Sequence, residues 1–494
     1  MAAKRSPGMA QQYAFQFDSS ACSGCKACQI ACKDKHNLPL GLRWRRVYEI
    51  SGGEWQQVGP AWQPQVFAYN LSIACNHCLR PICIEVCPAA AISKRPDGIV
   101  LIDPGRCLGC QYCSWACPYG ALQYDPGSGR MTKCTFCADE LDMGRPPACV
   151  AACPLRVLDF TVTTSQPASA PAQVVIPLPE ARLTQPALQL SPHPHACQAP
   201  PASLQLANRE EVQSDVHNDE CPLVLFTLLA QASAGAFTTA AILQAWLARR
   251  AGPLLADQLT WLAVLLAGLA LGLSLLISLL HLGRPTKAYR ALANLRASWL
   301  SREILFAGLS AGCWVIYVGL HWLSGSAGEF LRLPLLGITS LCGLGLVYSM
   351  ARVYRQRTIP AWNTWQTTAS FFMSAASLGS LSTGVALALA CHSLAIDNRL
   401  AVDSLRGLAI WATLFLILET AALLTFRSPA SPNRGPRLAC LLGGLLLTCA
   451  IVLKTGTWQS LVAAIAFGLA LCLALASAIQ GRLDFYAARG ETAL

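Results

Sequence analysis

The chain lacks any long run of basic residues. Its formal net charge is +11, from 37 Lys and Arg against 26 Asp and Glu, but the basic residues are spread over many short segments. No basic stretch is interleaved with aromatic residues, a pattern typical of nucleic-acid-binding surfaces. This absence argues against nucleic-acid binding and favours arginines that lie in loops next to a membrane.

The amino-terminal stretch MAAKRSPGMAQQYAFQFD lacks the marks of an export signal. It contains no apolar core segment and no pair of adjacent arginines. We therefore expect the 24 cysteines to begin in a reducing compartment, where a disulfide framework does not form.

The chain divides into parts of different composition. Sixteen of the 24 cysteines lie between Cys22 and Cys153, and all long apolar runs lie after Pro222. A length of 494 residues also indicates more than one domain. We expect a cysteine-rich domain over residues 1–160, a linker rich in Pro, Ala and Gln over 161–219, and a membrane domain over 220–494.

The cysteines of the first part form four groups. Two groups have the spacing C-x2-C-x2-C-x3-C, and they are Cys22, Cys25, Cys28, Cys32 and Cys107, Cys110, Cys113, Cys117. Two have longer middle gaps of four and eleven residues, and they are Cys75, Cys78, Cys83, Cys87 and Cys134, Cys137, Cys149, Cys153. The last three groups end in proline, as bacterial ferredoxin runs do.

This spacing predicts iron–sulfur clusters. Three closely spaced thiolates reach three irons of one cubane, and the fourth ligates a neighbouring cluster. Zinc sites do not need the third and fourth cysteines at these spacings, and disulfides do not suit the compartment. Sixteen thiolates are therefore expected to hold four 4Fe–4S clusters.

Two groups can exchange their last cysteines, so that each completes the cluster of the other. In a nested arrangement, group one exchanges with group four and group two with group three. The outer clusters would then have the ligands Cys22, Cys25, Cys28, Cys153 and Cys134, Cys137, Cys149, Cys32. The inner clusters would have the ligands Cys75, Cys78, Cys83, Cys117 and Cys107, Cys110, Cys113, Cys87.

The segments between the groups predict short strands. RWRRVYEISGGEWQQV alternates and is expected to turn at Gly52–Gly53, while RPDGIVLIDPGRC and GALQYDPGSGRMTKC indicate smaller strand–turn units. The fold class is thus an α+β ferredoxin-like domain with four clusters, followed by an all-α polytopic membrane domain.

Apolar runs of spanning length predict about eight membrane helices. Their expected ranges are 223–247, 259–282, 304–323, 334–351, 367–391, 407–426, 438–453 and 459–480. Loops on the side of the cysteine-rich domain carry eleven basic residues against six on the other side. The positive-inside rule therefore predicts a cytoplasmic cluster domain.

Two ionisable residues end consecutive helices on that side, His281 and Glu303. A quinol loses two protons with its two electrons, so its site needs proton acceptors near a cluster. Arg284 or Arg302 is a candidate to hold a quinone oxygen or to pair with Glu303. The alternatives are an interfacial histidine with membrane-surface arginines, and a haem held by His321 and His392.

The first part resembles the four-cluster electron-transfer subunit of dimethyl sulfoxide reductase and its molybdopterin relatives. The four cysteine groups in this order carry the resemblance, over residues 12 to 160. Some relatives have tryptophan in place of the second cysteine of group three and hold a 3Fe–4S centre. Cys110 at this position implies a full 4Fe–4S cluster.

The second part is similar to the membrane anchor subunit of the same family, from Asp219 to the end. ECPLVLFTLLAQASAGAF, LHLGRP, SREI and ARVYRQRTIPAWNTW carry the likeness. The resemblance implies eight helices, menaquinol oxidation and no haem, and it places the family's quinol-linked histidine and glutamate at His281 and Glu303. Two family subunits are thus expected in one chain.

The function expected is that of an electron-transfer and anchor subunit in the bacterial inner membrane. It would oxidise menaquinol and serve a separate molybdopterin catalytic chain, an S-oxide or N-oxide reductase of anaerobic respiration. No pterin-binding domain is visible in the sequence. Alternatives are a polysulfide or oxyanion reductase, a dehydrogenase that delivers electrons to quinone, and an ion-translocating or regulatory redox membrane protein.

Overall fold

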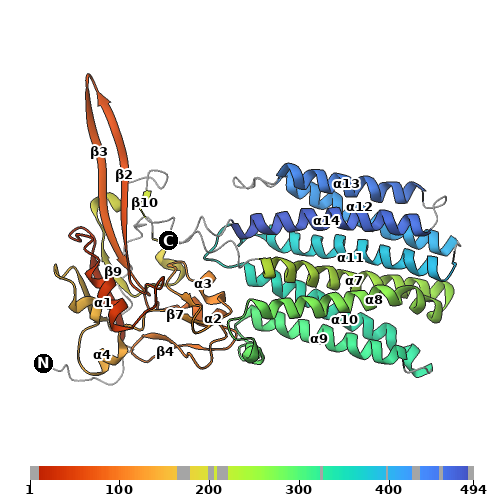
Figure 1. The fold of residues 1–494 in the computed structure, drawn as a ribbon, viewed down its shortest axis with the longest axis horizontal. Helices are drawn as coiled ribbons and strands as arrows, with labels where there is room; N and C mark the ends of the chain where they lie inside the picture. The colour runs from red at the N-terminus through yellow and green to blue at the C-terminus, as the bar shows by residue number, and fades with distance from the viewer. Residues whose placement is uncertain are drawn as a thin grey trace. The chain divides into compact units, whose positions relative to one another are not determined.

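A computed structural model describes residues 11–163, 178–197, 205–207, 221–322, 326–396, 399–425, 434–454 and 460–487. The chain forms two compact units. The first contains the described residues up to 207 together with Leu282–Ser298, and the second contains those from 221 to 281 and from 299 to 487. Strands and short helices make up the first unit and long helices the second, which confirms the expected fold class (Figure 1).

Strand β1 (Gln12–Asp18) lies at the centre of a three-stranded sheet in the first unit. It pairs antiparallel with β8 (Leu158–Thr163) and parallel with β9 (Leu188–Ser191). Phe15 and Phe17 of β1 are buried in a core that also contains cysteines of three groups. Because β1 precedes the first cysteine group and β8 follows the last, their pairing brings the ends of the cysteine-rich segment together.

Strands β2 (Arg46–Val58) and β3 (Ala61–Ile73) form a long antiparallel hairpin that extends away from the rest of this unit (Figure 1). The chain reverses at Gly59–Pro60, so the prediction of a turn at Gly52–Gly53 is wrong. Gly53 instead pairs with Val66 inside the ladder. The glycine pair falls within a longer strand, and Gly59, with a φ of +64°, provides the turn.

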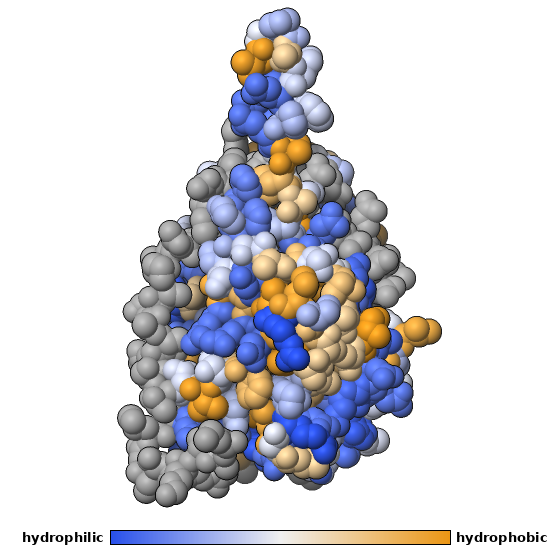
Figure 2. Space-filling view, turned by 90° about the vertical axis from the view of Figure 1, so that its left-hand side faces the viewer, coloured by the Kyte–Doolittle hydropathy of each residue, from blue (hydrophilic) through white to orange (hydrophobic). Residues whose placement is uncertain are grey.

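The outer half of this hairpin exposes apolar side chains. Trp55 and Trp62 are 60% and 61% exposed, and Val58 and Val66 lie exposed beside them. Figure 2 shows apolar residues among hydrophilic ones on the projecting part of this face. A protein rarely leaves several large apolar side chains together in water without a partner.

Described residues of the expected linker take part in the first unit. Strand β9 extends the sheet of β1, and β10 (Gln205–Ala207) pairs with β2. His193 stacks on Tyr69 and His195 on Phe67, with ring centroids 5.1 and 4.9 Å apart. The composition of the segment did not indicate these elements, because each short strand depends on a distant strand edge for its hydrogen bonds.

Short elements carry the cysteines. The helices of this part are α1 (Ala27–Lys35), α2 (Ile82–Val86), α3 (Tyr112–Ala116), α4 (Ala138–Asp142) and α5 (Ala148–Ala151). The two small hairpins are β4 (Ile92–Lys94) with β5 (Val100–Ile102), and β6 (Gln123–Asp125) with β7 (Arg130–Thr132). They confirm the expected strand–turn units. The 3-10 helices are η1 (Ala181–Leu183), η2 (Pro194–Cys197) and η4 (Pro285–Leu292).

The second unit contains eight helices long and apolar enough to cross a membrane, counted over the described residues. They are α7 (Cys221–Ala251), α8 (Pro253–Leu280), α9 (Trp299–Trp322), α10 (Ser326–Tyr354), α11 (Trp365–Ser393), α12 (Arg399–Thr425), α13 (Arg434–Lys454) and α14 (Ser460–Ala487). This confirms the expected number. Most helices are longer than predicted, because backbone hydrogen bonding continues into the polar and aromatic residues that flank each apolar run.

Helix α7 is the most buried of these helices and packs against α8, α10 and α11. Small residues bring α7 and α11 together: a Cβ on Gly235 would lie 1.7 Å from the carbonyl oxygen of Ala375, and one on Gly379 would lie 2.2 Å from the carbonyl carbon of Gly235. Close backbone approach through small residues is typical of membrane helix pairs. The α7–α11 contact therefore lies at the centre of the bundle.

Candidate functional site

Four cysteines from the two ends of the cysteine-rich segment surround one cavity. Cys22, Cys25 and Cys28 lie in and before α1, and Cys153 follows α5. The first three belong to group one and the last to group four, as a nested exchange requires. The β1–β8 pairing described above brings these distant positions together.

A second cavity is lined by Cys107, Cys110 and Cys113 of group three and by Cys87 of group two. The remaining lining residues are apolar apart from their backbone, and they include Pro88, Ile92, Leu108 and Met131. This set also follows the nested exchange.

The other eight thiols fall into two further sets. Cys83 lies within electrostatic reach of Cys75, Cys117 and Cys78. Cys32 lies within reach of Cys149 and Cys137, and Cys134 is close to both Cys32 and Cys149. The two cavities thus each combine three cysteines of one group with the last cysteine of another, and the electrostatic neighbours of the other eight thiols are compatible with the same arrangement.

The backbone between the cysteines has the same conformation in groups one and three. In group one, Gly24 and Lys26 have φ values of +69° and +60°; in group three, Gly109 and Gln111 have +69° and +58°. A left-handed backbone conformation costs free energy for residues other than glycine, and such residues cluster in functional loops. The matching angles indicate two copies of one ligand loop.

The chemistry of the thiols fits iron–sulfur clusters. Burial raises the pKa of the Cys78 and Cys110 thiols to about 12 and that of Cys137 to about 11. A thiolate in such surroundings needs a bound metal to stabilise its charge. No three His, Cys, Asp or Glu side chains of the described residues surround a point closely enough for a single ion. Two of the sets instead line cavities.

The segment Leu282–Ser298, which connects α8 to α9, belongs to the first unit. It lies against the loops around the Cys87, Cys107, Cys110 and Cys113 cavity. Asn294 Nδ2 donates to the Cys87 carbonyl oxygen (2.9 Å), and Ser298 Oγ donates to that of Val86 (2.8 Å). The Arg284 amide donates to the Leu108 carbonyl oxygen (3.1 Å).

Glycines allow this segment to approach the cysteine loop. A Cβ on Gly283 would lie 2.3 Å from the carbonyl oxygen of Gly129, and one on Gly109 would lie 3.1 Å from the Cα of Gly283. The side chains of Arg284 and Arg290 then donate to the carbonyl oxygens of Pro104 and Gly105. Arg284 and Arg290 thus anchor this segment to backbone oxygens.

His281 and Glu303, the quinol-site candidates, lie in the second unit at the two ends of this segment. His281 directly follows α8 and Glu303 lies in the second turn of α9, and these helices are neighbours. Nδ1 of His281 is buried without a hydrogen-bond partner among the described residues, and Glu303 is 3% exposed.

The two candidate arginines have different surroundings. The Arg284 side chain donates to the Pro104 carbonyl oxygen in the first unit (3.3 Å). The Arg302 guanidinium lies 4.2 Å above the ring of Trp299 in α9, within the same unit as Glu303. Arg302 is therefore the candidate that lies in the same unit as the acid, with its guanidinium on Trp299.

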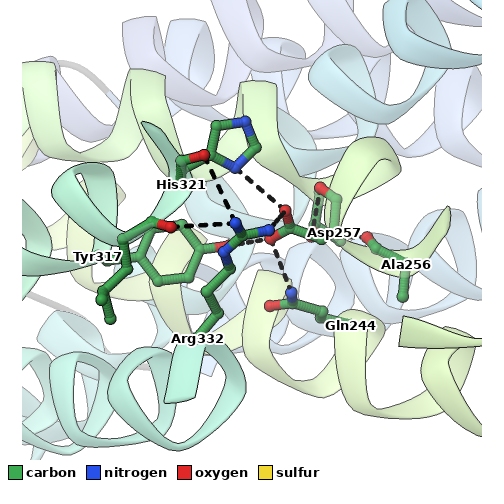
Figure 3. Close-up of polar contacts among 8 residues, drawn as sticks. Gln244, Ala256, Asp257, Tyr317, His321 and Arg332 are labelled. Atoms are coloured by element: carbon green, nitrogen blue, oxygen red, sulfur yellow. Dashed lines mark hydrogen bonds and ion pairs between the residues drawn. The ribbon is translucent and has the colours of Figure 1, made fainter. Parts of the chain in front are cut away.

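A buried polar cluster in the second unit was missed from the sequence (Figure 3). Asp257 of α8 accepts hydrogen bonds from Arg332 of α10 (2.8 Å), Tyr317 of α9 (2.8 Å) and Gln244 of α7 (3.2 Å). Nδ1 of His321 lies 3.1 Å from Asp257 Oδ2. Asp257 lies just before the expected range 259–282, so the sequence did not mark it as an intramembrane acid, and its partner Arg332 lies 75 residues away.

This cluster bears on the haem alternative. The His321 ring stacks on Trp261 with centroids 3.6 Å apart, and it faces Asp257. His392 is exposed at the end of α11. The structure thus gives His321 a carboxylate and an indole as neighbours.

Glu419, the acid inside α12, also has neighbours. Ser377 of α11 donates a hydrogen bond of 2.8 Å to its Oε1, and Arg437 and Arg482 lie within electrostatic reach. Arg482 in turn donates to Gln231 Oε1 (3.1 Å) and lies 3.5 Å above the Phe371 ring. These contacts link α7, α11, α12 and α14 by polar groups.

Comparisons with known proteins identify both halves. Residues 66–163 match the 4Fe-4S dicluster domain, and residues 216–431 match the DMSO reductase anchor subunit (DmsC). One polypeptide of the anaerobic dimethyl sulfoxide reductase of Escherichia coli (strain K12) is 45% identical over 205 residues, which are 41% of this chain and 100% of that relative.

More distant relatives come from other complexes. One subunit of the sulfite dehydrogenase of Allochromatium vinosum is 36% identical over 171 residues, 30% of this chain and 68% of that protein. The formate dehydrogenase iron-sulfur subunit of Wolinella succinogenes is 37% identical over 166 residues, 29% of this chain and 78% of that protein.

The cysteine sets and the eight apolar helices together define an iron–sulfur electron-transfer protein with its own multi-pass membrane anchor. The chain belongs to the dimethyl sulfoxide reductase family, and it joins the family's iron–sulfur subunit and anchor subunit in one polypeptide.

Proposed function

We propose that this protein oxidises menaquinol in the bacterial inner membrane and passes the electrons through four 4Fe–4S clusters to a separate molybdopterin catalytic subunit. One observation carries the proposal. The segment that begins after His281 and ends before Glu303 is hydrogen-bonded to the backbone carbonyl oxygens of Val86 and Cys87. The proposed proton acceptors and a proposed cluster ligand are thus joined by one short stretch of chain.

Each of the four nested cysteine sets would hold one cluster. The ligands are Cys22, Cys25, Cys28, Cys153; Cys134, Cys137, Cys149, Cys32; Cys75, Cys78, Cys83, Cys117; and Cys107, Cys110, Cys113, Cys87. When bound, the clusters supply one-electron transfer. At the set of Cys107, Cys110, Cys113 and Cys87, the apolar lining would limit access of water to the cluster.

His281 and Glu303 would take the two protons that menaquinol releases as it becomes menaquinone and gives up two electrons. The free Nδ1 of His281 is an available acceptor among the described residues, and Glu303 is a buried acid on the neighbouring helix. Arg302 would hold a quinone oxygen, and Arg284 would hold the connecting segment on the first unit.

Replacement of His281 or Glu303 tests this assignment. We expect His281→Phe and Glu303→Gln to abolish cluster reduction by a menaquinol analogue, while dithionite still reduces the clusters and iron content is unchanged. His392→Phe, at an exposed helix end, is the matched control. In this variant the menaquinol analogue should reduce the clusters at the normal rate. Normal rates in both site variants would contradict the proposal.

The terminal substrate is proposed to be an S-oxide or N-oxide, with polysulfide and other oxyanions as alternatives. The name of the E. coli relative supports the S-oxide. The catalytic chain would be a separate partner of anaerobic respiration. Co-purification with metal analysis tests this point: molybdenum is expected with iron, and a complex with iron but neither molybdenum nor tungsten would contradict it.

Electron flow in the opposite direction is the second candidate. The sulfite dehydrogenase and formate dehydrogenase relatives support it, because proteins with those names take electrons from a substrate. In that case the same His281 and Glu303 would give protons to quinone. Cluster reduction by menaquinol and cluster oxidation by menaquinone, measured in the purified complex, would separate the two directions.

We propose that the first unit faces the cytoplasm. Arg284, Lys287 and Arg290 donate to carbonyl oxygens of this unit, so their basic side chains have a structural role besides any effect on membrane orientation. Without these three, eight basic loop residues lie on the side of the cluster domain and six on the other side, which still favours the same orientation. An epitope inserted at Leu40, which is exposed, should be inaccessible to antibody in spheroplasts and accessible in inverted vesicles. The reverse pattern would place this unit outside.

A further inference from the structure

Arg45 is a buried cation without a carboxylate partner among the described residues. It directly precedes β2 and is 2% exposed. Its Nη1 donates to Ser72 Oγ (3.2 Å), and its guanidinium lies 4.4 Å from the centroid of the Phe15 ring. Its Nε and Nη2 are buried and have no hydrogen-bond partner in the described part of the chain. Arginine is rarely buried in this way unless a negative group compensates its charge.

The groups around Arg45 are cysteines of the two outer sets. Burial lowers the pKa of Arg45, but the nearby thiols of Cys149, Cys134, Cys28 and Cys32 outweigh this effect and raise it. Ser72, the acceptor for Nη1, lies 3.5 Å from Cys28 Sγ. Cys28 belongs to one outer set, and the other three belong to the second.

A purely structural role does not account for the unpaired nitrogens. Contact with the face of Phe15 stabilises a guanidinium, but it leaves the in-plane N–H groups without acceptors. Thiolate and sulfide sulfurs of a bound cluster are acceptors of the right charge. The two unpaired nitrogens and the cysteine neighbours therefore point to the same ligand.

We infer that Arg45 is a positioning residue that raises the reduction potentials of the two outer clusters, those of Cys22, Cys25, Cys28, Cys153 and of Cys134, Cys137, Cys149, Cys32. This inference rests on the proposed cluster ligands. A fixed positive charge stabilises the reduced cluster, which carries one more negative charge, more than the oxidised cluster. Hydrogen bonds to sulfur act in the same direction.

The test is a redox titration of the full-length protein monitored by EPR, for Arg45→Gln and Arg45→Lys. Signals are first assigned to clusters through single cysteine variants. We expect Arg45→Gln to lower the midpoint potentials of the outer clusters and to leave those of the inner clusters nearly unchanged. Arg45→Lys keeps the charge and should lie between Arg45→Gln and the unsubstituted protein.

Arg46→Gln is the matched control. Arg46 is the next residue, but its Nη2 donates to the Tyr119 carbonyl oxygen (2.7 Å), and it lies within electrostatic reach of Cys117 in an inner set. It should leave the outer potentials unchanged. Unchanged outer potentials in Arg45→Gln with full iron content, or an equal shift of all four clusters, would overturn the inference.

Iron content separates the remaining outcomes. If Arg45→Gln loses only the outer clusters and Arg45→Lys regains them, the compensating charge is supported. If all four clusters are lost and Arg45→Lys does not restore them, Arg45 is a folding residue and the inference is wrong. The number of clusters in the unsubstituted protein is measured first. Fewer than four would contradict the proposed function and not the role of Arg45.

Discussion

The side chain of Asn294 donates a hydrogen bond of 2.9 Å to the backbone carbonyl oxygen of Cys87. Asn294 lies in the stretch that connects α8 to α9, whereas Cys87 lines the cavity shared with Cys107, Cys110 and Cys113. The chain from the proposed quinol acceptors thus reaches a proposed cluster ligand through one polar contact.

Loss of this contact should slow electron delivery to the clusters. In Asn294→Leu combined with Ser298→Ala, two carbonyl oxygens lose their donors, at a cost of about 1–3 kcal/mol each where they stay buried. We expect slower cluster bleaching by a menaquinol analogue in stopped-flow absorbance, with unchanged iron. Lys287→Gln, which removes an exposed contact of 3.3 Å to Gly105, should have a smaller effect. Equal rates in all three proteins would contradict the prediction.

A methyl group on Gly283 should displace the same segment. Its Cβ would lie 2.3 Å from the Gly129 carbonyl oxygen, a backbone atom that cannot rotate away. We expect Gly283→Ala to cost about 1–3 kcal/mol and to speed hydrogen exchange at the Arg284 amide, which donates to Leu108 in the unsubstituted protein. Gly272→Ala in α8, where nothing lies within 4 Å of the added Cβ, is the control. An unchanged exchange rate in Gly283→Ala would show that the contact is not needed.

The Asp257 cluster should stabilise the helical unit. Asp257→Ala leaves the buried Arg332 guanidinium without its carboxylate, and breaking a buried pair costs about 3–5 kcal/mol. We expect a lower midpoint of thermal inactivation in detergent. Asp257→Leu combined with Arg332→Met should be milder, because no charge is left unpaired. Asp484→Ala, which removes a looser contact of 3.8 Å with Arg437, should shift the midpoint less. A midpoint unaffected by Asp257→Ala would rule out this role.

The exposed tip of the β2–β3 hairpin is predicted to bind the catalytic subunit. Trp55→Ser with Trp62→Ser removes apolar surface without touching a buried core, so the clusters should assemble normally. The molybdenum retained per iron after affinity purification should fall. Leu40→Ser, at a residue 94% exposed elsewhere in this unit, is the control. Full retention of molybdenum in the tryptophan variant would locate the partner elsewhere.

The sequence predicted the cysteine groups and the helices because both signals are local. C-x2-C spacing and runs of about twenty apolar residues are visible within a short window. The hairpin turn was misplaced for the same reason: Gly52–Gly53 is a strong local turn signal, yet its strand continues to Val58. Only the pairing with β3 shows that these glycines lie inside a ladder.

Contacts between distant residues were not visible. Arg332 and Asp257 are far apart in sequence, and nothing in either neighbourhood indicates the other. Arg45 stood among three arginines of one stretch, and its burial follows from the packing of Phe15 and Ser72 around it. The sequence suggested that the basic residues after His281 set the membrane orientation or bind quinol. In the structure, the side chains of Arg284 and Arg290 donate to backbone oxygens.

The placement of Leu282–Ser298 has a consequence for how the two halves stay joined. The chain passes from the first unit to the second, returns to the first for these residues, and then enters the second again. After a single cut in the proline-rich segment before α7, Leu282–Ser298 would stay covalently attached to the helices on either side of it. Its hydrogen bonds to the amino-terminal fragment would then be a noncovalent connection between the halves. Gene fusion and gene fission become nearly equivalent for such a protein, because a separately encoded anchor would still carry its own piece of the electron-transfer unit.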